Sequence, residues 1–447
     1  MKEKGLLQEV IGMAWPAVLE SFFVSLAGMI DTMMVATLGT YAVAAVGLTT
    51  QPKFIALAVF ISCNVAVSAL VARRRGQGNQ KSANEILATA LTFTVIAAVI
   101  VTLITVVGAD WIMRLCGSNA DTHEAVTTYY RIIQGGMIFN VLSLVINAAQ
   151  RGSGNTKISM RTNMTSSILN VCFNYLLING HFGFPALGLA GAAIATVLGT
   201  VVACIMSVAS LFQKNSYVSI PLMLKEKIRP KLVSLKSITS LSSNFLLENV
   251  LMRVGFMTTA LIAARLGTNA FAAHQAGMNF LNLGFAFGDG MQVAAVALIG
   301  RSLGESNPEK AKKYGHLCQR VGLLISIALA AVMFFGARFL FSLYFSDAET
   351  LEMGVLISRY IMIVILFQIS QVIFGGCLRG AGDVRYTLIV SIISVTVIRT
   401  LVTWLLSGAI VNLGLHAIWL GILSDQLSRF ILLSIRFKQG KWTNISI

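Results

Sequence analysis

The stretch LGTYAVAA at residues 38–45 recurs as LGTNAFAA at residues 266–273, with six of its eight positions identical. The first copy begins at Leu38 and the second at Leu266, and we call the spacing between these two positions the repeat offset. The same offset aligns QRGSG at residues 150–154 with LRGAG at residues 378–382. A constant offset over so long a stretch indicates that the second half of the chain duplicates the first. Further matches at this offset are Ala69 and Leu70 with Ala297 and Leu298, Arg73 with Arg301, Gly76 with Gly304, Asn79 with Asn307, Arg131 with Arg359, Phe139 with Phe367, and Glu20 with Glu248.

The composition of the chain is that of a membrane protein. Of its 447 residues, 56% are hydrophobic and only 12% are charged, which is far from the usage of soluble proteins. A formal net charge of +16 would suggest a nucleic-acid partner in a soluble protein, but here the basic residues cluster between apolar segments and indicate membrane topology instead. The six cysteines stand apart from one another, which favours core packing over a zinc or redox site.

Twelve apolar segments are long enough to cross a bilayer as α-helices, which takes about 20 residues each. We therefore expect an all-α polytopic membrane protein with twelve transmembrane helices. Because each half then holds six helices, the second half enters the membrane in the same orientation as the first. The two six-helix bundles are expected to be related by a pseudo-two-fold axis along the membrane normal. The expected helices lie near residues 10–37, 43–72, 84–107, 124–148, 158–179, 187–212, 235–264, 270–300, 312–336, 352–376, 385–407 and 413–435.

The basic residues gather on one side of the predicted spans. The connections on that side carry 24 Lys and Arg residues, whereas those on the other side carry three, Arg114, Arg265 and Arg338. The positive-inside rule then predicts that both termini are cytoplasmic.

The longest basic connection, residues 213–234, also contains Pro221 and Pro230. Prolines in a charged stretch are typical of a linker rather than of a span. We therefore expect it to join two lobes, an N-terminal one of residues 1–212 and a C-terminal one of residues 235–447.

Asp31 stands out among the acids within the predicted spans. It lies in SLAGMIDTMMVATLG, residues 25–39, where an ionised side chain costs at least ~2.5–3.5 kcal/mol at the bilayer centre. The repeat places Thr259 at the equivalent position, and no basic residue lies three or four positions from Asp31 on its helical face. Asp425 and Arg429, by contrast, are four positions apart and are expected to pair. A functional role is therefore predicted for Asp31.

A solitary carboxylate in a membrane interior can couple two transport events. In a site poor in water it holds a proton more readily than in solution, and it releases the proton when water or a cation arrives. If a proton and a cationic substrate compete for Asp31, inward proton flow drives the substrate outward, with ~2.3 kcal/mol available per proton for each 100 mV. Asn147, Asn170 and Asn174 lie in the same half, and amides among helices either join the helices or help to form a cation or proton site.

Several motifs resemble those of the multidrug and toxic compound extrusion (MATE) family. Pro16 precedes Asp31 by fifteen residues, AFAAHQAGMNF lies at residues 270–280, and LRGAGD ends the expected tenth helix with an echo, QRGSGN, after the fourth. The resemblance covers nearly the whole chain. It implies two lobes with a central cavity alternately open to each side, and export of organic cations driven by H+ or Na+. We accordingly expect a transporter rather than an enzyme, a monomer in the inner (cytoplasmic) membrane of a bacterium, with membrane lipid around it and no nucleic-acid partner.

The resemblance also implies a set of site residues. Asp31 would be the carboxylate whose protonation is linked to bending of the first helix at Pro16. Asn147, Asn170, Asn174 and Thr196 would complete the polar cluster that couples proton or cation binding. The substrate would contact Asp31, Met33, Met34, Phe139, Glu248, Asn279 and Asp289. Methionines offer a pliable apolar surface that suits varied ligands, and ordinary helix packing explains each of them equally well.

Two departures from the family pattern bear on the coupling ion. Some relatives carry Asp where this chain has Asn174, and NorM-type members carry Asp where it has Gln368. Without these acids a Na+ site built from several carboxylates is disfavoured, so we expect DinF-like proton coupling centred on Asp31. Na+ at Asp31 is the alternative, since one carboxylate with several side-chain carbonyl oxygens can also ligate it. No other cofactor or metal is expected.

Other functions are weighed against antiport. A lipid-linked sugar flippase of the same superfamily would line its cavity with basic residues to hold phosphates, and Arg253 and Arg399 leave this possibility open. An intramembrane aspartyl protease needs a Gly-x-Gly-Asp turn, whereas AFGDG at residues 286–290 begins with Ala286. The sequence has no His-Glu-x-x-His zinc motif and no phosphate-binding loop, which argues against a metalloprotease and against an ATP-driven pump.

Overall fold

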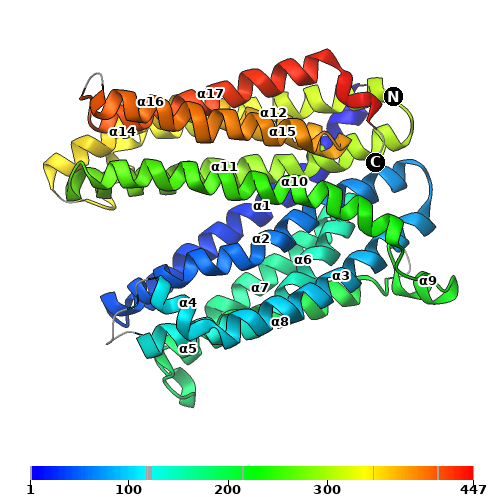
Figure 1. The fold of residues 1–447 in the computed structure, drawn as a ribbon, viewed down its shortest axis with the longest axis horizontal. Helices are drawn as coiled ribbons and strands as arrows, with labels where there is room; N and C mark the ends of the chain where they lie inside the picture. The colour runs from blue at the N-terminus through cyan, green and yellow to red at the C-terminus, as the bar shows by residue number, and fades with distance from the viewer. Residues whose placement is uncertain are drawn as a thin grey trace. The chain divides into compact units, whose positions relative to one another are not determined.

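The structure is a computed structural model that describes residues 3–116, 118, 123–213, 216–345, 347–409 and 412–445. All regular elements in these residues are helices, so the predicted all-α fold is confirmed (Figure 1). The contacts divide the chain into two compact units. The N unit is Leu19–Ser242, and the C unit combines Met1–Val18 with Ser243–Ile447.

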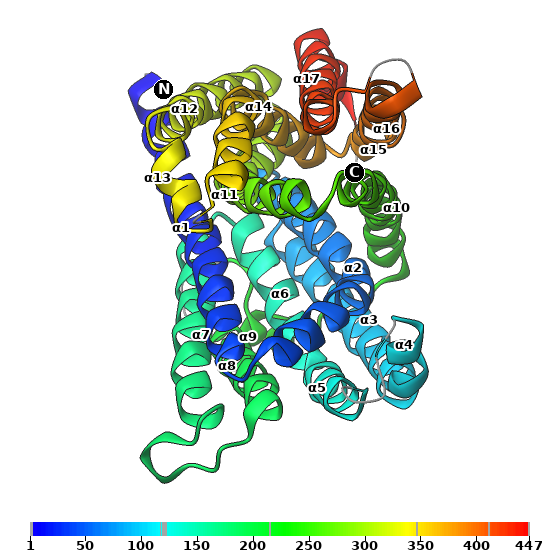
Figure 2. The same cartoon turned by 90° about the vertical axis from the view of Figure 1, so that its left-hand side faces the viewer.

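The N unit is a bundle in which α7 packs along α8 and α6 packs against α2, α3 and α8 (Figure 2). Small apolar residues, among them Ala192 and Ala193 of α8, are fully buried in its core. Its helices are α2 (Thr40–Gly76), α3 (Gln80–Val107), α4 (Ala109–Leu115), α5 (His123–Gly135), α6 (Met137–Gly152), α7 (Thr156–Leu177), η1 (His181–Gly183), α8 (Gly188–Ser210) and α9 (Ile220–Lys225).

The C unit packs α11 against α14, with α12 and α17 also in contact with α14. Its core buries the aromatic side chains of Trp419 and Phe341 among Ile and Val residues. Its helices are α11 (Thr268–Gly304), α12 (Pro308–Phe335), α13 (Ala337–Ser342), α14 (Ala348–Ala381), α15 (Val384–Ser391), η2 (Ile392–Arg399), α16 (Thr400–Trp404), η3 (Leu405–Ala409), α17 (Leu415–Gln439) and η4 (Lys441–Asn444).

Two long helices contribute to both units. The division falls after Val18 in α1 (Glu3–Ala36) and after Ser242 in α10 (Leu232–Ala264). Pro16 lies inside α1, two residues before its division point. The expected linker, residues 213–234, falls within the N unit, and two of its residues lie outside the described ranges.

The internal duplication predicted from the sequence is confirmed in the helices. The bounds of α11 are those of α2 shifted by the repeat offset, and α12 is related to α3 by the same shift. The turns before α3 and α12 are also built alike. Asn79 Oδ1 accepts a hydrogen bond from the Ser82 backbone N–H at 2.9 Å, and Asn307 Oδ1 accepts one from the Lys310 N–H at 2.9 Å. Both asparagines thus cap a helix N-terminus in the way that short polar side chains favour.

The twelve expected spans all coincide with helices. Among the described residues, nine helices are long and apolar enough to cross a membrane, and the pair α5 and α6 would be a tenth span. The expected segments at 158–179 and 235–264 coincide with α7 and α10, whose polar residues lower their hydropathy. The expected span at residues 124–148 is formed by α5 and α6 together. The chain bends by 42° between α5 and α6, at Gly136, where a Cβ would overlap the side chain of Val197.

The two Arg-Gly-x-Gly motifs place glycines where helices touch or end. A Cβ on Gly152 would lie 2.4 Å from a backbone oxygen of α2, and one on Gly380 would lie 2.7 Å from a backbone oxygen of α11. Only glycine allows the backbones to approach so closely. The second glycines, Gly154 and Gly382, have φ angles of 81° and 92°, in the left-handed region that favours glycine.

We predict that Gly380→Ala lowers the midpoint of thermal unfolding of the purified protein, because an added methyl forces α14 away from α11 at a cost of about 1–3 kcal/mol. Gly375→Ala in the same helix is the matched control, since its Cβ would meet its nearest neighbour at an ordinary 3.5 Å. Equal midpoints for the two variants would show that the close approach is not a constraint.

Candidate functional site

Each unit holds a buried acid that pairs with the arginine of its Arg-Gly-x-Gly motif. In the N unit, Arg151 Nη1 donates to Glu20 Oε1 at 3.1 Å, and the two side chains are 11% and 9% exposed. In the C unit, Arg379 Nη2 donates to Glu248 Oε1 at 2.6 Å. The repeat offset separates the two acids and also the two arginines, so the ion pair itself is duplicated.

The neutral hydrogen-bond partners of the two ion pairs are duplicated as well. In each unit, two side chains of one helix donate to the acid, and an amide oxygen of another helix accepts from the arginine. Each partner in the C unit stands one repeat offset after its counterpart in the N unit. The counterparts are Ser159 and Thr387, Asn163 and Ser391, and Asn64 and Gln292.

These ion pairs attach α1 and α10, the two helices that contribute to both units, to one unit each. Glu20 is the first charged residue of α1 beyond its division point, and Glu248 is the first charged residue of α10 beyond its own. A buried charge that loses its partner destabilises a protein by about 3–5 kcal/mol. Each acid is therefore paired with an arginine of its own unit and serves a structural role.

We predict that Glu20→Gln strongly destabilises the protein, because it leaves the guanidinium of Arg151 buried and uncompensated. The double variant Glu20→Gln/Arg151→Gln should recover much of the loss. A double-mutant cycle on thermal stability measures the coupling, and the equivalent cycle on Glu248 and Arg379 is the internal control. Additive effects in both cycles would contradict the duplicated ion pair.

Asp31, by contrast, is held by an amide. Asn174 Nδ2 donates to Asp31 Oδ1 at 2.5 Å and lies 3.4 Å from Asn170 Oδ1. Asn170 Nδ2 in turn donates to Thr196 Oγ1 at 3.1 Å. One chain of hydrogen bonds thus joins α1, α7 and α8 within the N unit. Three of the four residues predicted to surround Asp31 take part in it.

The fourth predicted residue, Asn147 of α6, lies in a separate polar cluster. Its Nδ2 donates to Ser143 Oγ at 3.3 Å, and its Oδ1 accepts from Ser207 Oγ at 3.2 Å. The two serine hydroxyls are 2.9 Å apart. Asn147 therefore joins α6 to α8, and its part in ion coupling stays a prediction.

A basic residue approaches Asp31 from the neighbouring helix α2. Lys53 and Asp31 interact electrostatically, although the sequence shows no base on the helical face of Asp31. Lys53 and Thr196 also line a cavity of about 30 Å³, room for about two water molecules. The cavity lies at the bend between α5 and α6, because Gly136 and Met137 line it too. Asp31 thus has a cation and a small cavity in its surroundings.

The side chain of Asn174 can form a hydrogen bond with Asp31 in either of its protonation states. An amide carries both donor and acceptor atoms, so it donates to an ionised carboxylate and, turned over, accepts from a protonated one. In the described residues, Asn174 Oδ1 is buried and has no hydrogen-bond donor. The amide of Asn174 therefore fits either protonation state of Asp31, whereas the arginines beside Glu20 and Glu248 pair with a carboxylate.

The remaining predicted substrate contacts are distributed over both units. In the N unit, Met33 is 65% exposed and Phe139 is exposed, whereas Met34 packs against the core. In the C unit, Asn279 and Asp289 lie exposed on α11, and Glu248 is enclosed in its ion pair. A common binding surface for these residues stays a prediction.

The C unit has no counterpart of the Asp31 site among its described residues. Thr259 stands at the equivalent position and accepts a hydrogen bond from Arg399 Nε at 3.0 Å. Arg399 also contacts Asp425 at 3.5 Å, while Arg429 binds Asp425 through two hydrogen bonds of 2.8 and 3.0 Å. The predicted pairing of Asp425 with Arg429 is confirmed. The two units therefore differ in charge at the repeat-related position.

Two neighbours of Asp31 were missed as site residues. Lys53 is a basic residue within a predicted span, but the spacing of residues along the sequence does not show which acid on another helix it approaches. Tyr129 of α5 is buried and also interacts electrostatically with Asp31. A tyrosine in an apolar helix carries no sequence signal that separates this role from ordinary packing.

Comparisons with known proteins agree with this architecture. The MatE family model matches residues 16–176 and, again, residues 245–405, once in each repeat. The "Probable multidrug resistance protein NorM" of Thermotoga maritima is 27% identical over 436 residues, which cover 97% of this chain and 93% of the relative.

Two solved structures share the fold with TM-scores of 0.90, and each comparison covers 99% of both chains. One is a MATE in complex with MaD3S, at 22% identity. The other is the outward-facing conformation of a multidrug resistance MATE family transporter of the MOP superfamily, at 23% identity. At such low identity these likenesses establish the fold alone.

Proposed function

Since this chain belongs to the MATE family, whose members are membrane transporters and not enzymes, we propose that it exports organic cations by proton-coupled antiport. One observation carries the proposal. Asp31 is an intramembrane acid held by a neutral amide, whereas Glu20, Glu248 and Asp425 are each bound to arginine. An acid without an arginine partner can exchange a proton for a cation, because protonation of the acid does not leave a buried guanidinium without its counter-ion.

The exchange would link Asp31 to movement of α1. Pro16 interrupts the hydrogen bonds of this helix, and bends in helices occur at such positions. The part of α1 before residue 19 belongs to the C unit, whereas the part that bears Asp31 belongs to the N unit. A bend at Pro16 would therefore let the protonation of one unit alter the alignment of a helix that both units share.

The proposal extends to location and topology. The relative from Thermotoga maritima is a bacterial protein, and this chain is a multi-pass membrane protein. We place it in the cytoplasmic membrane of a bacterium as a monomer, with both termini in the cytoplasm, because the basic connections lie on that side.

We predict that Asp31→Asn abolishes efflux of ethidium from proteoliposomes with an imposed pH gradient, because an amide cannot carry the proton. Its thermal stability should fall less than that of Glu20→Gln, since no buried arginine loses its ion-pair partner. Glu124→Gln, which removes an exposed acid from α5, is the matched control and should transport normally. Undiminished efflux by Asp31→Asn would rule out the role assigned to Asp31.

Na+ is the alternative coupling ion, and the buried Asn174 Oδ1 favours it because this oxygen is a suitable ligand beside a carboxylate. The same proteoliposomes separate the two ions. Proton coupling predicts efflux with a pH gradient in the absence of Na+. Efflux that follows a Na+ gradient at clamped pH would refute proton coupling and leave the transporter assignment intact.

We also predict that Lys53→Met lowers the KM for a monovalent cationic substrate about fivefold, since it removes repulsion of about 1 kcal/mol near Asp31. Lys157→Met, at an exposed position of α7, is the control for loss of one positive charge and should leave the KM unchanged. Equal KM values in the two variants would contradict a position of Lys53 beside the bound cation.

A further inference from the structure

A second cavity lies in the N unit, and its lining includes neither Asp31 nor Asn174. It measures about 250 Å³ and is formed where α2 ends and where α3 and α10 begin. This is far more than the ~10–15 Å³ that one water molecule needs. Nothing in the proposed transport cycle uses it. Its lining residues are Leu70, Arg74, Ser82, Glu85, Ile86, Lys231, Val233, Ser234 and Ser237.

The charges of the cavity leave one arginine in excess. Lys231 Nζ donates to Glu85 Oε1 at 2.7 Å, so these two charges neutralise each other. Arg74 uses one amino group to bind Gln77 at 2.8 Å, while its Nε is buried and has no acceptor in the described residues. The lining therefore carries a net charge of about +1 and a buried donor that lacks a partner.

Further donors surround the excess charge. Three serines line the cavity, and α10 begins at Leu232, where backbone N–H groups of a first helical turn have no intrahelical acceptor. Hydroxyls, a guanidinium and a helix N-terminus together are the groups that bind a phosphate. A monoanionic phosphodiester would neutralise the net charge of this cavity.

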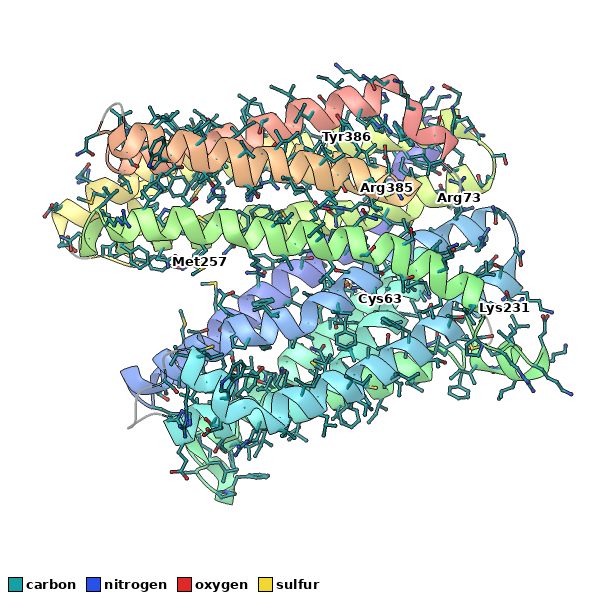
Figure 3. The ribbon with its side chains drawn as sticks, in the orientation of Figure 1. Cys63, Arg73, Lys231, Met257, Arg385 and Tyr386 are labelled. Atoms are coloured by element: carbon teal, nitrogen blue, oxygen red, sulfur yellow. The ribbon has the colours of Figure 1, made fainter. Side chains whose placement is uncertain are left out.

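The apolar residues around the cavity favour the phosphate of a phospholipid over a free phosphate ion. Leu232 and Val233 at its rim are 87% and 77% exposed. The outer face of α3 continues the apolar surface along the bundle, with Val95, Ile96 and Val99 all exposed. Lys231, at the start of α10, marks this end of the N unit, near α9 (Figure 3). The cavity thus joins a polar wall to the apolar surface that faces lipid.

We propose that this cavity binds the phosphate of an anionic membrane lipid, with Arg74 as its main charged contact. The acyl chains would extend over Leu232 and along α3. A lipid bound at the first turn of α10 would stabilise the part of this helix that belongs to the N unit. This proposal does not depend on the identity of the exported substrate or of the coupling ion.

Native mass spectrometry of the purified, detergent-solubilised protein tests the proposal, with phosphatidylglycerol as the probe. Arg74→Gln should weaken binding of the first phosphatidylglycerol about tenfold, as expected for loss of a hydrogen bond to a charged group. Arg74→Lys should retain most of the affinity. Arg229→Gln, an exposed arginine of the same basic connection that does not line the cavity, is the matched control and should bind as the wild type does.

Two further arms distinguish the source of the phosphate. Phosphatidylcholine, which has the same acyl chains and no net charge, should bind at least tenfold more weakly than phosphatidylglycerol. Inorganic phosphate alone should neither bind at the same concentration nor displace the lipid. Equal affinity of Arg74→Gln and the wild type would overturn the site, and binding of inorganic phosphate as tight as that of the lipid would overturn the assignment to a lipid.

Discussion

The constraint on which this structure depends is that a charge inside an apolar bundle needs a partner. Glu20, Glu248 and Asp425 each form an ion pair with an arginine of their own unit. Asp31 instead accepts a hydrogen bond from the amide of Asn174. This amide is neutral and can form a hydrogen bond with the ionised or the protonated carboxyl group. The difference between an arginine and an amide as partner thus separates these three acids from Asp31, the acid that we propose exchanges ions.

The duplication shows which parts of this arrangement the fold requires. Both copies keep the acid, the arginine, their neutral partners and the glycine that lets two helices touch. The glycine and the arginine of each motif contact the same neighbouring helix, because the amide that accepts from the arginine lies on the helix that the glycine touches. The copies differ at Asp31 and Thr259, and the C unit places an arginine there. The duplicated scaffold therefore carries different side chains at these two repeat-related positions.

Much of the fold could be predicted from the sequence, because helices, their termini and a repeat of constant offset are local or periodic features. The pairing of Asp425 with Arg429 was predictable for the same reason, since four residues make one helical turn. The pairing of Glu20 with Arg151 was not, because 131 residues separate them and only packing brings them together. The repeat did hold a signal, since both members recur at the same offset.

The site could be predicted only in part. Asn170 and Asn174 are four residues apart on one helical face, and their contact with each other follows from that spacing, whereas the contact of Asn174 with Asp31 depends on the packing of α7 against α1. Asn147 and Lys53 depend on which helices become neighbours, and polarity along the chain carries no such information. The need for glycine at residue 136 likewise comes from a distant contact, because Val197 leaves no room for a side chain there.

The account rests on the claim that Asp31 gives up its proton when a cation binds. The most direct measurement is the release of protons when ethidium is added to the purified protein in a weakly buffered solution with a pH indicator. We expect the wild type to release protons in proportion to the ethidium bound, and Asp31→Asn to bind ethidium weakly and release none. Ethidium binding without proton release in the wild type, or the same release from Asp31→Asn, would contradict the account.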